Sequence, residues 1–140
     1  MSTVIRNVVI NDTENVDILI ADGRIVNVGP AKSLNADTVI DGNGAVAIPG
    51  LVDLHTHLRE PGREDAETVD TGTLAAARGG YTAVHAMANT TPVADTAGVV
   101  EQVWRLGQEA GHCDVYPVGA VTQGLKGEAL AELGAMADSA

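Results

Sequence analysis

The sequence has 140 residues, of which 45% are hydrophobic, and it carries a formal net charge of −11. This length suffices for one small domain or part of a larger one, and the apolar share excludes a disordered chain. The acidity argues against nucleic acid as a partner, because phosphate binding needs clustered Lys and Arg side chains.

The cysteine content and the chain's hydropathy both bear on location. The one cysteine, Cys113, cannot form an intrachain disulfide, which favours a reducing compartment. No charged and then apolar leader opens the chain, and no apolar run is long enough to span a bilayer. We therefore expect a cytoplasmic protein with no membrane partner.

Residues 1–48 contain short β-branched runs that are typical of strands. Asp22-Gly23 lies between two of these runs and is a strong signal for a two-residue hairpin. We therefore predict a small antiparallel β-unit. Its expected strands span residues 4–10, 16–21, 24–28, 39–41 and 45–48.

From Leu51 onward the pattern alternates between strands and helices, which predicts βα units and a parallel sheet. A glycine pair, Gly79-Gly80, and then Gly111 would end the first two helices. The second helix, capped by Asp95 or Thr96, is expected to bury one apolar face. The expected strands span residues 51–57, 81–87 and 114–121. The first and third helices are expected at residues 66–78 and 128–138. The apolar face of the second helix comprises Val99, Val103, Leu106 and Ala110.

Three such βα units are fewer than the eight that a closed barrel needs, and a closed barrel typically has about 250 residues. Three parallel strands would also leave open sheet edges, which soluble proteins avoid. We therefore expect the sequence to be the N-terminal fragment of a longer enzyme.

Polar residues gather where the first of these parallel strands ends. His55 and His57 are two residues apart, so on a strand they would share a face, about 6–7 Å apart at their Cα atoms. Imidazoles at that spacing can bind one metal ion. Arg59 follows, and its planar guanidinium matches a carboxylate. An isolated His-x-His is more often a structural pair, but Asp53 and Arg59 add polar groups that need a partner.

Other polar residues have simpler interpretations. Asp53 either orients an imidazole or is a buried, hydrogen-bonded carboxylate. His85 is expected to be structural rather than a metal ligand, and Cys113 a small core residue. Solvated or bordering roles are expected for His112, Lys126, Glu60 and Arg63.

The stretch 49–62, PGLVDLHTHLREPG, resembles the first barrel strand of the amidohydrolase superfamily and, more narrowly, of the dihydroorotases that carry HLREPG. The resemblance covers most of residues 45–130. It implies an α/β fold: the first three βα units of a metal-dependent hydrolase TIM-like (β/α)8 barrel, preceded by a small β-sandwich portion. The implied division is residues 1–48 for the sandwich portion and 49–140 for the incomplete barrel. Further matches are Glu67-Thr68, Gly72-Thr73, residues 75–77, Gly79-Gly80, residues 87–90 and Pro92-Val93.

The same resemblance implies roles for four residues. His55 and His57 would be ligands of one or two zinc ions, and Arg59 and Asn89 would bind the substrate. The implied reaction is the reversible cyclisation of N-carbamoyl-L-aspartate to (S)-dihydroorotate in pyrimidine (UMP) biosynthesis. The catalytic general acid/base, an aspartate, would lie beyond residue 140, so the 140 residues alone should be inactive. Aspartate transcarbamoylase is an implied partner, and a homo-oligomer is expected.

Two alternatives stay open at the level of sequence. Another cyclic amidohydrolase, such as an allantoinase or hydantoinase, would share the barrel and the His-x-His, but usually lacks the following Arg. An inactive, dihydroorotase-like partner of aspartate transcarbamoylase would commonly lose the histidines. The sequence also departs from the family at Ala88, where proline is commoner, which frees the backbone before Asn89.

Overall fold

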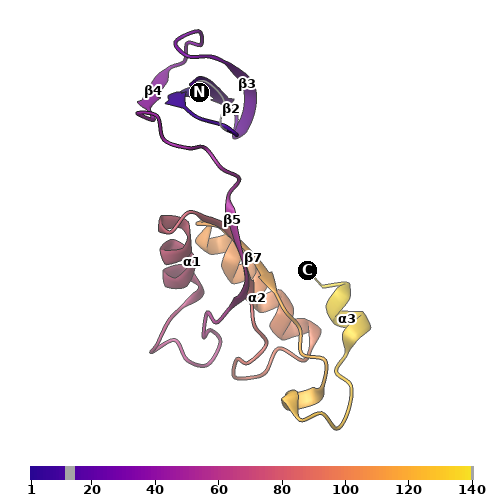
Figure 1. Ribbon diagram of the computed structural model, residues 1–140. Helices are drawn as coiled ribbons and strands as arrows, with labels where there is room; N and C mark the ends of the chain where they lie inside the picture. The colour runs from indigo at the N-terminus through magenta and orange to yellow at the C-terminus, as the bar shows by residue number, and fades with distance from the viewer. Residues whose placement is uncertain (12–14, 140) are drawn as a thin grey trace. The chain divides into compact units, whose positions relative to one another are not determined.

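The computed structural model describes residues 1–11 and 15–139, and it divides into two compact units, Met1–Pro49 and Gly50–Ala140 (Figure 1). Each unit is described by itself. Across the described residues, no helix combines the length and the apolar character needed to cross a bilayer.

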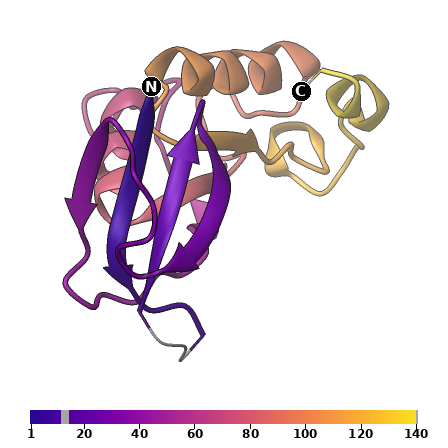
Figure 2. The same cartoon turned by 90° about the horizontal axis from the view of Figure 1, so that it is seen from above.

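The first unit is a four-stranded sheet in the order β3-β2-β1-β4 (Figure 2). Asp22 and Gly23 both have positive φ, 50° and 72°, which confirms the predicted hairpin between β2 and β3. Its strands are β1 (Ser2–Val8), β2 (Val16–Ala21), β3 (Arg24–Pro30) and β4 (Thr38–Asp41).

Two predictions for this unit are wrong. The sheet is not wholly antiparallel, because β4 pairs with β1 in parallel. Residues 45–48 form no strand; one isolated bridge joins Val46 to Val9. The chain turns at Asn43 and Gly44, both with positive φ, and two backbone hydrogen bonds, from Val9 N–H to Ala45 O and from Ala47 N–H to Val9 O, then join it to the end of β1 among the described residues. Local β propensity could not show which neighbour these short runs would meet.

The first unit leaves much of its apolar surface uncovered. Val4, Val8 and Ile18 are buried, but the two edge strands and the segment after β4 are exposed. The exposed large apolar side chains of these strands and of the segment after β4 are Ile25, Val26, Val28, Val39, Ile40, Val46 and Ile48.

The second unit contains a parallel sheet in the order β5-β6-β7, as predicted. Helices α1 and α2 connect the strands and pack on one face of the sheet, where Val84 and Val115 are 1% exposed. The opposite face is open, with Leu54 at 71% exposure. The elements are β5 (Leu51–Thr56), α1 (Val69–Arg78), β6 (Tyr81–Ala86), α2 (Ala97–Ala110) and β7 (Asp114–Pro117).

The helix ends largely follow their local signals. Thr68 caps α1, and its side chain and that of Thr71 each accept a backbone N–H from the other. The helix therefore starts three residues later than predicted. Gly79 follows α1, and Gly111, with φ 65°, ends α2 as predicted. The predicted apolar face of α2 is partly confirmed: Val103 is buried and Leu106 packs against the core, but Val99 and Ala110 are only half-buried, and the other buried positions are Val100 and Gly107.

The last predicted elements are only partly correct. Strand β7 is shorter than expected, and α3 covers Leu133–Ala137 instead of residues 128–138. Residues 129–131 bond to an earlier segment: Gln123 N–H donates to Ala129 O, and Ala131 N–H donates to Val121 O. These tertiary hydrogen bonds replace the first turns of the predicted helix. A 3₁₀ turn, η1 (Gln123–Leu125), lies between.

Candidate active site

The candidate site lies where β5 and β6 end. The pairing of β5 with β6 shifts between Asp53 and Thr56, so the strict alternation expected for the strand is broken by a bulge. The carboxylate of Asp53 accepts the His55 backbone N–H at 2.9 Å, and this bond is the main reason that the pKa of Asp53 is lowered. Asp53 therefore fixes the backbone at the bulge.

His55 and His57 remain close to each other beyond the bulge. Their ring centroids are 5.1 Å apart, with an angle of 68° between the ring planes. Two imidazoles bound to one tetrahedral ion, with metal–nitrogen bonds of about 2.0–2.1 Å, would have centroids about 5 Å apart. The separation of the two rings therefore fits a shared metal ion. No third His, Cys, Asp or Glu joins them within residues 1–11 and 15–139.

Asn89 joins this pair from the segment after β6. Its Oδ1 lies 2.8 Å from His57 Nδ1, so the protonated Nδ1 can donate to the amide oxygen. That bond leaves His57 Nε2 with a lone pair, which is the form that binds a metal. The Asn89 NH2 group takes no part in this contact and can donate a hydrogen bond to a carboxylate.

Arg59 is exposed and has φ 65°, a left-handed conformation that arginine seldom adopts. The residues on either side hold it: Leu58 is buried at 3% exposure, and the Glu60 carboxylate accepts the backbone N–H of Val69 at 2.8 Å. A strained residue held by its neighbours is common at binding sites. The role of Glu60 at the start of α1 had no local sequence signal.

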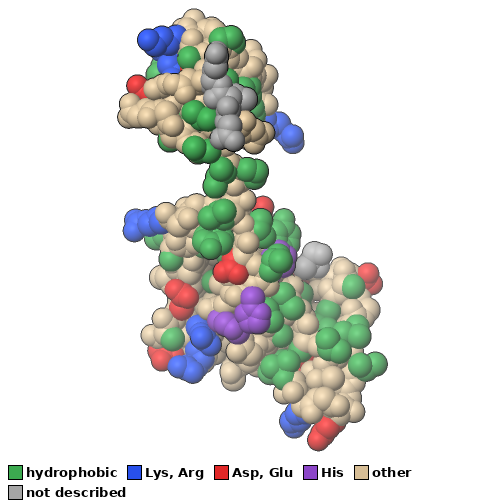
Figure 3. All heavy atoms as spheres, viewed as in Figure 1, with side chains coloured by type: hydrophobic (Ala, Val, Ile, Leu, Met, Phe, Trp, Pro, Cys, Tyr) green, Lys and Arg blue, Asp and Glu red, His purple; other side chains and the backbone are tan. Residues whose placement is uncertain are grey.

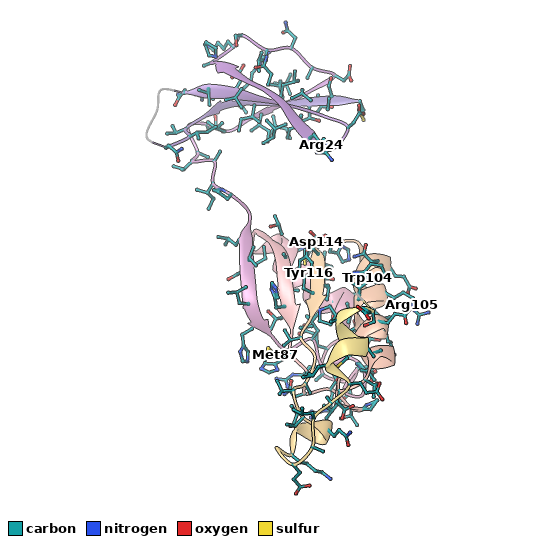
Figure 4. All side chains as sticks on the ribbon, turned by 90° about the vertical axis from the view of Figure 1, so that its right-hand side faces the viewer. Arg24, Met87, Trp104, Arg105, Asp114 and Tyr116 are labelled. Atoms are coloured by element: carbon teal, nitrogen blue, oxygen red, sulfur yellow. The ribbon has the colours of Figure 1, made fainter. Side chains whose placement is uncertain are left out.

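The site is visible on the surface of the second unit. Figure 3 shows a histidine patch with Lys or Arg side chains close by, and His55 and Arg59 are both exposed. Figure 4 shows Met87 at one end of the parallel sheet and Asp114 at the opposite end. Since Met87 directly follows β6, the candidate site lies at the carboxyl end of the strands.

The other candidate residues have structural contacts. His85 stacks on Tyr116 with 5.3 Å between ring centroids, and its Nδ1 lies 3.2 Å from the Asp53 carbonyl oxygen. His112 Nε2 lies 3.1 Å from an Asp70 carboxylate oxygen. The two residues are 42 positions apart in the chain, and the sequence did not indicate this contact. Burial raises the pKa of the Cys113 thiol.

Comparison with known proteins places these features in context. Residues 44–140 match the family model described as "Dihydro-orotase-like". A dihydroorotase of Streptomyces coelicolor is 66% identical over 139 residues, which is 99% of this chain and 32% of that protein. A dihydroorotase of Leifsonia xyli subsp. xyli is 62% identical over 97% of this chain and 31% of its own length. The chain thus spans about a third of the length of these curated relatives.

Solved structures agree on the fold. The L-hydantoinase of Arthrobacter aurescens has a TM-score of 0.71 at 23% identity, covering 86% of this chain and 28% of that structure. A crystal structure of a dihydroorotase has a TM-score of 0.65 at 23% identity, covering 88% and 32%. The described chain therefore has a mixed α/β fold shared with these two structures.

Proposed function

This chain belongs to the dihydro-orotase-like family, and on that premise we propose that the whole protein is a zinc-dependent dihydroorotase. It would catalyse the reversible cyclisation of N-carbamoyl-L-aspartate to (S)-dihydroorotate in pyrimidine biosynthesis. The observation that carries the proposal is that His55, His57 and Asn89 lie in successive contact at the strand ends, His55 beside His57 and His57 bonded to Asn89. The names of the relatives do not favour the alternatives, another cyclic amidohydrolase or an inactive partner chain.

His55 and His57 are the proposed zinc ligands. The separation of their rings supports this assignment, and the bond from His57 Nδ1 to Asn89 holds Nε2 available. A bound zinc ion would polarise the amide carbonyl and lower the pKa of a bound water. Catalytic zinc sites usually have three protein ligands, so at least one more must come from elsewhere in the protein.

Arg59 and Asn89 are the proposed binding residues for the substrate carboxylate. The guanidinium can donate two parallel N–H bonds, and the Asn89 NH2 group can donate a further one. Both residues lie in segments that follow neighbouring parallel strands, and such segments meet at one edge of a sheet. The pair would orient the ring beside the two histidines and exclude substrates without a carboxylate.

The finer architecture is also proposed from the family. The β5-β6-β7 sheet would be the first part of a (β/α)8 barrel in residues 49–140, and residues 1–48 part of a β-sandwich. The open face of the parallel sheet and the exposed apolar strands of the first unit support this arrangement, because such surfaces are usually covered. The general acid/base aspartate would lie outside residues 1–140, which alone would be inactive. Association with aspartate transcarbamoylase and self-association stay predictions.

The test uses the full-length protein, expressed with zinc. Arg59→Ala should raise KM for dihydroorotate by about 10–100-fold with unchanged zinc content, because a charge-assisted hydrogen bond contributes about 1.5–3 kcal/mol. Arg105→Ala is the matched control, since Arg105 is an exposed arginine of α2. Hydrolysis of hydantoin or allantoin with no turnover of dihydroorotate would overturn the substrate assignment, and absence of bound zinc would favour an inactive partner.

A further inference from the structure

Two loops carry the proposed binding residues. The first loop, residues 57–68, contains Arg59, and the second loop, residues 87–96, contains Asn89. A side-chain bond joins them at one point, His57 Nδ1 to Asn89 Oδ1 at 2.8 Å. The loops are therefore in contact at the base of the site.

A second connection between the loops lies farther along both. Thr91 N–H donates to the Pro61 carbonyl oxygen at 2.9 Å. The two connections involve residues 57 and 61 of the first loop, so Arg59 lies midway between them in the chain. On the second loop they are only two residues apart, at 89 and 91. The backbone of Arg59 is thus held between two fixed points.

Next to the second connection, the backbones of the two loops approach closely at Gly62 and Thr91. The φ of Gly62 is +101°, and a Cβ at this position would lie 2.2 Å from the Thr91 carbonyl oxygen and 2.6 Å from Thr91 Cβ. The nearest atom belongs to the backbone, so no side-chain rotation can relieve the overlap. Only a displacement of one loop could make room.

Both loops are anchored to the core, the second through Ala88 and Ala94, which are 6% and 3% exposed. In the first loop, Leu58 is 3% exposed and packs in the core with Val69. The Glu60 carboxylate accepts the Val69 N–H at 2.8 Å, which ties the first loop to the first turn of α1. A larger residue at position 62 would therefore displace one loop relative to the other and change the spacing between Arg59 and Asn89.

We propose that Gly62, by its close contact with Thr91, is a positioning residue that sets the spacing between Arg59 and Asn89 for a carboxylate-bearing ring. Glu60 has a supporting role, because its bond to α1 holds the first loop against that contact. This inference rests on the proposed function, in which Arg59 and Asn89 bind the carboxylate. In this proposal Gly62 acts on the substrate through Arg59 and Asn89.

Gly62→Ala in the full-length zinc enzyme is the first test. We expect KM for dihydroorotate to rise between about tenfold and a hundredfold with a smaller change in kcat, because displacements of about 1 Å have effects of this size. Gly127→Ala is the matched control: Gly127 also has positive φ, +75°, but nothing lies within 4 Å of its added Cβ. The control separates the close contact from backbone strain alone.

A second pair of variants keeps the test decisive if Gly62→Ala does not fold. Glu60→Ala removes the bond to Val69 and should raise KM, whereas Glu60→Gln retains an oxygen acceptor and should restore KM close to wild type. Equal KM values in Gly62→Ala and Gly127→Ala, or an unchanged KM in Glu60→Ala, would overturn the inference while the proposed function stands. A wild-type enzyme that binds zinc but does not turn over dihydroorotate would overturn both.

Discussion

The two ends of the β5-β6-β7 sheet both carry histidines, but the histidines have different surroundings. At the carboxyl end, His55 and His57 face each other and Asn89 bonds to the second ring. At the amino end, His112 contacts the exposed carboxylate of Asp70 on α1. Histidine alone therefore does not mark a site; a second polar group from a neighbouring strand segment does.

The connections at the two ends also differ. The carboxyl-end loops are long and are bonded to each other, whereas the amino end has short turns around Gly79-Gly80 and Gly111. A cavity of about 470 Å³ lies at the amino end, and its lining includes Gly107 and Cys113. Short turns join the helices to the strands of the sheet, and long loops carry binding residues. The comparison predicts that variants at the two ends affect different measurements.

The largest effect is expected at the carboxyl end. His55→Ala and His57→Ala should each lose zinc and lower the turnover of dihydroorotate by about 10³-fold or more, because a catalytic ion contributes several kcal/mol. Metal analysis and steady-state kinetics on the full-length protein measure both. His112→Ala should keep zinc and activity. Loss of zinc in His112→Ala, or its retention in His55→Ala, would break the distinction between the two ends.

An intermediate effect is expected where α2 packs on β7. A Cβ at Gly107 would lie 2.5 Å from Val115 Cβ, so Gly107→Ala should lower stability. Overpacking costs about 1–3 kcal/mol, more than the roughly 1 kcal/mol that alanine gains in a helix. Thermal unfolding measures this change, and KM should stay constant. Gly98→Ala on the same helix has open space and should stabilise slightly. Equal shifts in both variants would contradict the packing account.

The smallest effect concerns Cys113 at the amino end. Burial raises the pKa of its thiol, and the adjacent charge of Asp114 adds to this. Because the thiolate is the reactive form, Cys113 should react with a thiol reagent at neutral pH more slowly than in the unfolded protein. The same measurement on Cys113→Ser shows how much of the observed reaction belongs to the Cys113 thiol. A reaction as fast as in denaturant would show that this end is more open than the structure indicates.

Local signals in the sequence were enough for much of the fold. Asp22-Gly23 predicted the hairpin, Gly111 predicted the end of α2, and the change of pattern at Leu51 predicted the parallel sheet. The spacing of His55 and His57 also predicted that their rings would be close. These features depend on turn conformation and on periodicity, which neighbouring residues determine by themselves.

Only the tertiary structure decided the remaining features. The parallel pairing of β4, the bulge after Asp53 and the tertiary hydrogen bonds of residues 129–131 depend on which strand or segment lies alongside. The bond from His57 to Asn89 and the contact of Gly62 with Thr91 join residues about 30 positions apart. Such contacts are set by strand register and by the packing of helices on the sheet. No local pattern encodes them, because their energy arises only when both loops are already in place.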